Sequence, residues 1–223
     1  MGMGKHLQRE LDHLKRDLLS IGVLVEEAIE KSILAFEERR SDLAQQVIAT
    51  DKKIDETEVE LEESCLKILA LHQPVAEDLR FVAAVIRINN DLERIGDYAV
   101  SISERAMHIM KDPITVPPDL KRLAQLAKQM LRDSLDAFVK RDAKFARKIC
   151  VNDDSVDQIH RKIIDEVKEA MLKNPEHIEA WLDVFTTTRR LERIADMATN
   201  IAQDVVYMVE GEIIRHQPNQ YPR

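Results

Sequence analysis

Four pairs of acidic residues, each spaced by one helical turn, are the residues whose types and spacing could do chemistry. They are Asp51 with Asp55, Glu93 with Asp97, Asp153 with Asp157, and Glu192 with Asp196. Two like charges at positions i and i+4 of a helix are neighbours, and they destabilise it by about 0.2–0.5 kcal/mol. Carboxylates on one helix face can instead chelate hard cations through their oxygens. The pattern therefore points to metal binding.

Distances along the chain indicate which pairs meet. In the first half the acids are centred on Pro74: Asp55 and Glu93 lie 19 residues from it, and Asp51 and Asp97 lie 23 residues from it. In the second half the matching acids lie 17 or 18 and 21 or 22 residues from the equivalent proline. Antiparallel helices joined at each proline would bring four acids to one height. Carboxylates crowded in this way raise one another's pKa unless cations neutralise them.

Position 58 offers each half one further metal ligand. Glu58 follows Asp55 by three residues, on the same face of a helix. Its counterpart in the second half is His160. We expect both to contribute less firmly than the four acid pairs.

The elements that must position these acids are long helices. With 33% charged residues, 4% aromatic residues and five glycines, the composition is typical of packed helices rather than sheets. Val47, Ile54, Leu61 and Ile68 recur every seven residues, as a buried stripe does. A second stripe consists of Leu92, Ile95, Ala99 and Ile102. Prolines and other breaks predict helices near residues 5–39, 41–72, 74–111, 119–140, 142–173 and 175–214.

The two halves of the chain repeat each other. A shift of 102 residues superposes Ser32, Phe36 and Arg39 on Ser134, Phe138 and Arg141, and beyond the prolines the shift becomes 99 residues. A period near 100 residues indicates a duplicated three-helix unit. We predict an all-α fold of two antiparallel three-helix bundles in tandem, over residues 1–111 and 119–214, with Pro74 and Pro175 as the first residues of their helices.

Composition and charge argue against several classes of protein. The net charge of −8 comes without a basic stripe, so nucleic acid is not an expected partner. No apolar run reaches about 18 residues, which argues against a membrane span. The N-terminus lacks the apolar segment of a secretory signal, so we expect a cytoplasmic protein. Cys65 and Cys150 have no metal-knuckle spacing and are expected to be small buried side chains.

Three alternatives to a metal-binding helical bundle remain at this stage. Acids are plentiful, and Arg94 and Arg193 could pair with them on a solvated surface. A di-metal oxidase would need two ExxH motifs, for which Glu10 with His13 is one candidate and Asp157 with His160 comes closest to a second. A structural or chaperone-like bundle would bind partners without metal. The histidines at positions 72, 108, 177 and 216 lie near predicted helix ends, where capping or surface roles are expected.

The chain resembles a known family. The segments that carry the resemblance are "LHQPVAEDLR" at 71–80, "RINNDLERIGDYAVSI" at 87–102 and the second copy "RRLERIADMATNIAQD" at 189–204. They are similar to the PhoU family of phosphate-signalling proteins, and the likeness covers essentially the whole chain. His72 is a departure, because arginine or another basic residue is commoner there in the family.

The resemblance implies a function that composition and spacing do not reveal. Members carry E(D)xxxD motifs that bind a multinuclear metal cluster, with iron in some members and zinc or magnesium in others. The motifs fall on the same eight acids in this sequence. Members repress phosphate-starvation genes and restrain phosphate uptake, as adaptors between the ATPase subunit of the phosphate ABC transporter and the sensor histidine kinase. They are not enzymes, and they often form homodimers.

Overall fold

The computed structural model describes the backbone of residues 3–151 and 153–214, and within them the side chains of residues 6–151 and 155–214. These residues form helices, with no strand among them. The α-helices are α1 (Met3–Glu38), α2 (Ser41–His72), α3 (Ala76–His108), α4 (Asp119–Lys140), α5 (Ala143–Val151), α6 (Asp153–Lys173) and α7 (Ile178–Glu210). The predicted all-α fold is confirmed.

The apolar stripes predicted from the sequence form the core. Every member of the seven-residue stripe of α2 is buried, and so is every member of the α3 stripe. Burial of such a stripe supplies most of the stability of a helix that would be marginal alone. Cys65 belongs to the same buried face of α2, while Cys150 is half-buried on α5. Burial raises the pKa of the Cys65 thiol to about 12, so this side chain behaves as a small hydrophobe.

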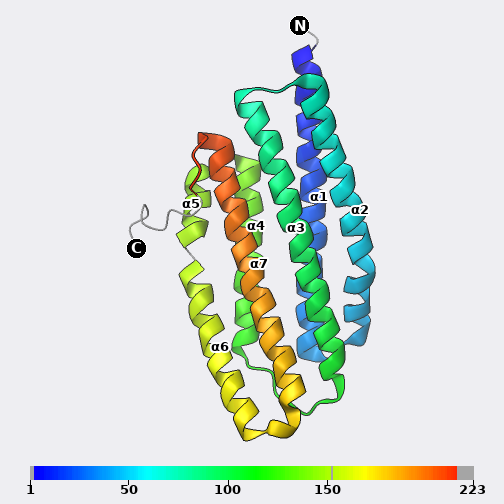
Figure 1. Ribbon diagram of the computed structural model, residues 1–223, viewed down its shortest axis with the longest axis vertical. Coiled ribbons are helices and arrows are strands. Elements are labelled where there is room, and N and C mark those ends of the chain that lie inside the picture. The colour runs from blue at the N-terminus through cyan, green and yellow to red at the C-terminus, as the bar shows by residue number, and fades with distance from the viewer. Residues whose placement is uncertain (1–2, 152, 215–223) are drawn as a thin grey trace.

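The helices run antiparallel along one long axis (Figure 1). In the first half α1, α2 and α3 pack on one another, and in the second half α4 packs with α5, α6 and α7. The halves meet where α3 lies against α7 and α1 lies against α4. One cluster of buried apolar side chains includes residues of both halves, and the rings of Phe81 and Phe138 stack across the boundary at 5.6 Å.

The helix ends differ in detail from those predicted. α3 begins at Ala76 rather than at Pro74, and Pro175 opens a short 3-10 helix, Pro175–His177, that precedes α7. α3 ends at His108 and continues as a 3-10 turn, Ile109–Lys111. The helix expected over residues 142–173 is present as α5 and α6 on either side of residue 152, which lies outside the described residues. Because the three-residue turn from Gln73 to Val75 is tight, it still joins α2 to α3 as antiparallel neighbours.

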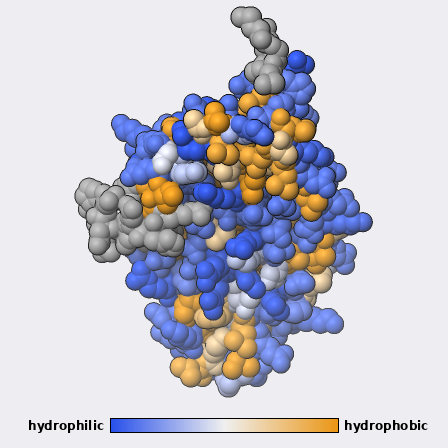
Figure 2. All heavy atoms as spheres, turned by 45° about the horizontal axis from the view of Figure 1, so that its top comes forward, coloured by the Kyte–Doolittle hydropathy of each residue, from blue (hydrophilic) through white to orange (hydrophobic). Residues whose placement is uncertain are grey.

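The surface is largely hydrophilic, but apolar side chains gather at the end of the bundle where α2 passes into α3 (Figure 2). Among the exposed residues of that segment are Leu71, Val75 and Leu79. No helix in the described part of the chain combines the length and the apolar character that crossing a membrane requires.

Candidate metal centre

The acids of the first half lie on two adjacent helices. α2 carries Asp51, Asp55 and Glu58, and α3 carries Glu93 and Asp97. Buried residues of the two stripes hold the helices together beneath the acids, which remain half-buried or exposed. The predicted meeting of both acid pairs at one height is therefore what the helix packing produces.

A glycine lets the two helices approach closely at this level. A Cβ atom on Gly96 would lie 3.3 Å from Cδ1 of Ile54 on α2 and 3.9 Å from Oδ1 of Asp51. The first distance is shorter than an ordinary van der Waals contact, so a larger residue would require the side chain of Ile54 to shift by a few tenths of an ångström. The repeat-equivalent residue in the second half is Ala195.

The electrostatics show that the five carboxylates act on one another. Burial raises the pKa of Asp51 above its ordinary value, and the charges of Asp55 and Asp97 raise it further. Burial also raises the pKa of Asp97, with a further increase from Asp55, while Arg190 of α7 acts in the opposite direction. The effect of acids on α2 upon an acid on α3, and the reverse, means that the two pairs lie near each other.

The two glutamates belong to the same cluster. Burial is the main cause of the raised pKa of Glu93, followed by the charges of Asp97, Asp55 and Glu58, with Arg94 opposing them. The pKa of Glu58 is raised by burial, then by Glu62 and Asp55. Glu58 thus lies near Asp55, while its role as a further ligand stays a prediction.

We define the first acid cluster as Asp51, Asp55, Glu58, Glu93 and Asp97. Its negative charges are not balanced by ion pairs within the described residues. Within the described residues, none of its members forms an ion pair with a lysine or arginine, and Arg94 is exposed without reaching Glu93. The donor set consists of carboxylate oxygens from two helices, which are the ligands that hard divalent and trivalent cations prefer. The residues present therefore fit a multinuclear metal site.

Asn89 is a neighbour of the cluster that the sequence did not single out. It is buried one turn before Glu93 on α3, and its Nδ2 donates a hydrogen bond of 2.9 Å to the backbone oxygen of Glu58. Its Oδ1 has no hydrogen-bond partner. A buried amide oxygen left without a partner is costly, and such an oxygen is also a suitable ligand for a hard cation or its bound water. The place of Asn89 beside the cluster follows only from the packing of α3 on α2.

The second half treats its acids differently. Nη2 of Arg161 lies 3.6 Å from Oδ2 of Asp157, and Arg193 lies 3.8 Å from Glu192 and 3.5 Å from Asp196. One alternative raised from the sequence was that Arg193 pairs with the acids, and in this half the structure shows that pairing. These arginines would compete with a cation for the carboxylate oxygens.

Two further positions of the second half were predicted as ligands. Asp153 is the first residue of α6, but its side chain lies outside the described residues. His160 is half-buried on α6, and its Nε2 is buried without a hydrogen-bond partner. Among the described residues, His160 thus has one buried ring nitrogen that is not used in a hydrogen bond.

The motif considered for a di-metal oxidase is not assembled. Nδ1 of His13 lies 2.6 Å from Asp17, its neighbour one turn along α1, rather than facing a metal site with Glu10. Glu10 instead faces His6 and His72. His108 and His177 lie near acids at helix ends, as expected, and His216 lies outside the described residues.

Fold and site together define a class: an all-α bundle of two repeated helical units, in which adjacent helices present paired carboxylates. A model of the PhoU domain matches this chain twice, over residues 18–106 and 120–205. The chain belongs to the PhoU family. The resemblance seen in the sequence is thereby confirmed.

Individual relatives match over nearly the full length. The chain is 36% identical over 212 residues to the "Phosphate-specific transport system accessory protein PhoU homolog" of Aquifex aeolicus, covering 95% of this chain and 96% of that protein. The crystal structure of PhoU from Pseudomonas aeruginosa aligns with a TM-score of 0.88 at 34% identity, over 92% of this chain and 99% of that one. A phosphate transport system regulatory protein PhoU from Streptococcus pneumoniae aligns with a TM-score of 0.87 at 30% identity, over 93% and 98%.

Proposed function

We propose that this chain is a negative regulator of phosphate-starvation signalling and of phosphate uptake. The observation that carries the proposal is the match, over nearly the whole chain, to proteins named as accessory or regulatory proteins of phosphate transport. Those names describe regulators rather than enzymes, and the proposed role is likewise non-enzymatic.

The proposed mode of action is that of an adaptor. The chain would connect the ATPase subunit of the phosphate ABC transporter with the sensor histidine kinase of the phosphate regulon, on the cytoplasmic side of the membrane. A bundle of long helices with a largely hydrophilic surface offers several extended faces for such docking. We also propose that the chain acts as a homodimer, which light scattering of the purified protein would test.

The first acid cluster is the proposed site of a multinuclear metal cluster, with iron as the first candidate and zinc or magnesium as alternatives. Cations bound there supply the positive charge that the five carboxylates lack. Asp51 and Asp55 on α2 and Glu93 and Asp97 on α3 would bind the same ions. The ions would thereby fix the angle between the two helices. A fixed angle presents a rigid surface to partners. The acids of the second half contribute a weaker site in this proposal.

The test measures alkaline phosphatase activity in phosphate-rich medium, in cells whose copy of this gene has been deleted. High activity that the wild-type gene returns to a low level supports repression of the phosphate regulon. Low activity in the deletion strain, unchanged by the gene, contradicts it.

The metal-dependent part is tested in the same strain with the double variant Asp55→Asn/Glu93→Gln. We expect it to restore repression poorly while accumulating to the wild-type level. The matched control is Glu60→Gln/Glu104→Gln, which removes two exposed charges from the same helices outside the cluster and should repress normally. Equal repression by both variants would contradict a role for metal but not the regulatory function.

A further inference from the structure

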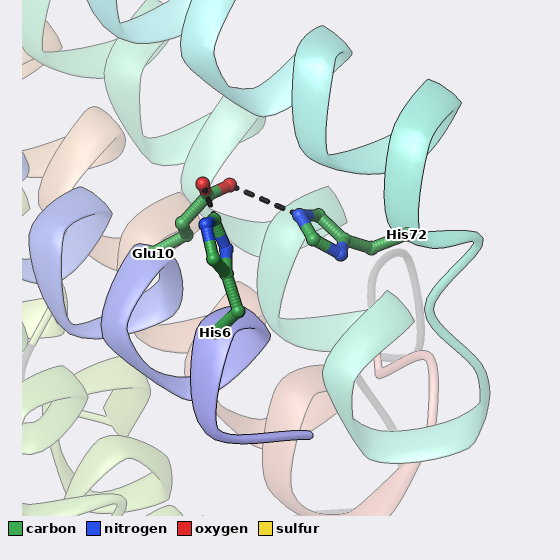
Figure 3. A group of neighbouring side chains, drawn as sticks. All are labelled: His6, Glu10 and His72. Carbon is green, nitrogen blue, oxygen red and sulfur yellow. Dashed lines mark ion pairs between the residues drawn. The ribbon is translucent and has the colours of Figure 1, made fainter. Parts of the chain in front are cut away.

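A second group of side chains with metal-binding chemistry lies at the end of the bundle. His6 and Glu10 are one turn apart near the start of α1, and His72 is the last residue of α2. Because α1 and α2 are antiparallel neighbours, the start of one lies beside the end of the other (Figure 3). The three side chains point toward one another, with one ligand atom of each within 4.8 Å of the others.

The distances suit a small, tetrahedrally coordinated cation. Nδ1 of His6 lies 3.2 Å from Oε1 of Glu10, and Nε2 of His72 lies 3.3 Å from Oε2. Ligands about 2.0–2.1 Å from a tetrahedral zinc ion are separated from one another by about 3.3 Å. Each nitrogen–oxygen separation has about this length, one to each of the two oxygens of Glu10, so both imidazoles lie within reach of an ion bound at that carboxylate.

The donor set differs in chemistry from that of the first acid cluster. Two imidazole nitrogens and one carboxylate favour zinc and neighbouring transition metals, whereas carboxylates alone favour harder cations. Glu58, the nearest acid of that cluster along α2, lies 14 residues before His72, or about 21 Å along the helix. The two sites are chemically and spatially separate.

The surroundings allow entry and hold the ligands in place. The side chain of His72 is 13% exposed and that of Glu10 is 37% exposed, so both are partly fixed by packing, while His6 is 61% exposed and free to adjust. His6 and Glu10 also line an open pocket of about 500 Å³ between α1 and α2, through which a cation can reach them.

We propose that His6, Glu10 and His72 form a zinc-type transition-metal site that joins the start of α1 to the end of α2. Nothing in the proposed regulatory function requires this site. The proposal rests on two nitrogen donors and one carboxylate from two helices. A bound ion would join these helices at the end of the bundle where the exposed apolar residues Leu71 and Val75 lie. The bound ion would thus order that surface as well.

The test is a Zn²⁺ titration of the full chain without an affinity tag, in competition with a chromophoric chelator. We compare wild type with His72→Gln, His6→Gln and the control His13→Gln, which removes a histidine that pairs only with Asp17 in the described residues. In either ligand variant the affinity for one zinc ion should fall by about 100-fold or more, because loss of even an outer-shell partner costs 10–100-fold. The titration then shows one tightly bound zinc equivalent fewer than in wild type. The control should keep it.

A second measurement separates binding from misfolding. Added Zn²⁺ should raise the melting temperature of wild type and of His13→Gln, but should raise that of His6→Gln much less, since a cation that binds only the folded state stabilises it. His6 is exposed, so its replacement leaves the fold intact. Unchanged zinc affinity and stoichiometry in both ligand variants would overturn the proposal.

Discussion

The two halves of the molecule place acids at equivalent positions of equivalent helices, but they neutralise them differently. In the first half the pKa values of Asp51, Glu58, Glu93 and Asp97 are raised, mainly by burial, and no acid of the cluster forms an ion pair with lysine or arginine among the described residues. In the second half Arg161 and Arg193 lie close to the acids. Arg161 corresponds in the repeat to Val59, so a single change of residue type supplies one of these charges. The duplicated framework thus leaves the acids of one copy without an ion pair to lysine or arginine among the described residues, and gives the acids of the other copy arginine partners.

The largest expected difference between the halves is in metal affinity. The double variant Asp55→Asn/Glu93→Gln should weaken Fe²⁺ or Mg²⁺ binding by about 100-fold or more, since it removes two ligands where even outer-shell changes cost 10–100-fold. The equivalent variant of the second half, Asp157→Asn/Glu192→Gln, should weaken the tightest binding by only a few-fold. Isothermal titration calorimetry of metal-free protein measures both. Equal losses would break the comparison, because the halves would then bind metal alike.

A smaller effect is expected when the second half is made to resemble the first. The variant Arg161→Val/Arg193→Gln releases Asp157, Glu192 and Asp196 from their ion pairs. Exposed pairs contribute about 0–1 kcal/mol each, so the affinity of the second site should rise by roughly tenfold. The same titration shows this as a second tight binding event. The control Arg94→Gln in the first half should change affinity little, and the absence of any gain in the double variant would show that the arginines do not suppress metal binding.

The smallest expected effect concerns the stability of the metal-free protein. Asp55 raises the pKa of Asp51, Glu93 and Asp97, so Asp55→Asn removes the charge at the centre of the repulsion. We expect a gain of a few tenths of a kcal/mol up to about 1 kcal/mol, seen as a rise of roughly 1–4 °C in melting temperature.

The matching variant in the second half should behave in the opposite way. Asp157→Asn removes a one-turn ion pair with Arg161, which costs roughly 0.3–0.5 kcal/mol. Both melting curves are recorded in the presence of a chelator. A fall in melting temperature for Asp55→Asn would show that the first acid cluster is stabilised by contacts other than metal.

Much of the fold was predictable because helical periodicity is a local property of the sequence. The stripe of Val47, Ile54 and Leu61 lies on one face of any helix that contains it, whatever packs against that face. Counting residues from Pro74 located the acids at one height even though α3 begins two residues later than predicted. The later start of α3 did not change the relative heights of the acids. Those heights depend on the register of the two antiparallel helices, which the tight turn fixes.

Other features of the site could not be predicted from spacing. Nothing local distinguishes Arg94, which leaves Glu93 without an ion pair, from Arg193, which lies close to both Glu192 and Asp196. The spacing of Glu10 and His13 suggested one site, whereas the fold places Glu10 between His6 and His72.

By itself the sequence determined the helices, their buried faces, the internal repeat and the level at which the acids of the first half meet, because these depend on periods of a few residues and on turn positions. Only the tertiary structure decided which charges neutralise which acids, which histidines share a carboxylate, and how α3 and α7 join the halves through one core. Those outcomes depend on side-chain directions and on contacts between residues far apart in the chain, and no local pattern encodes them.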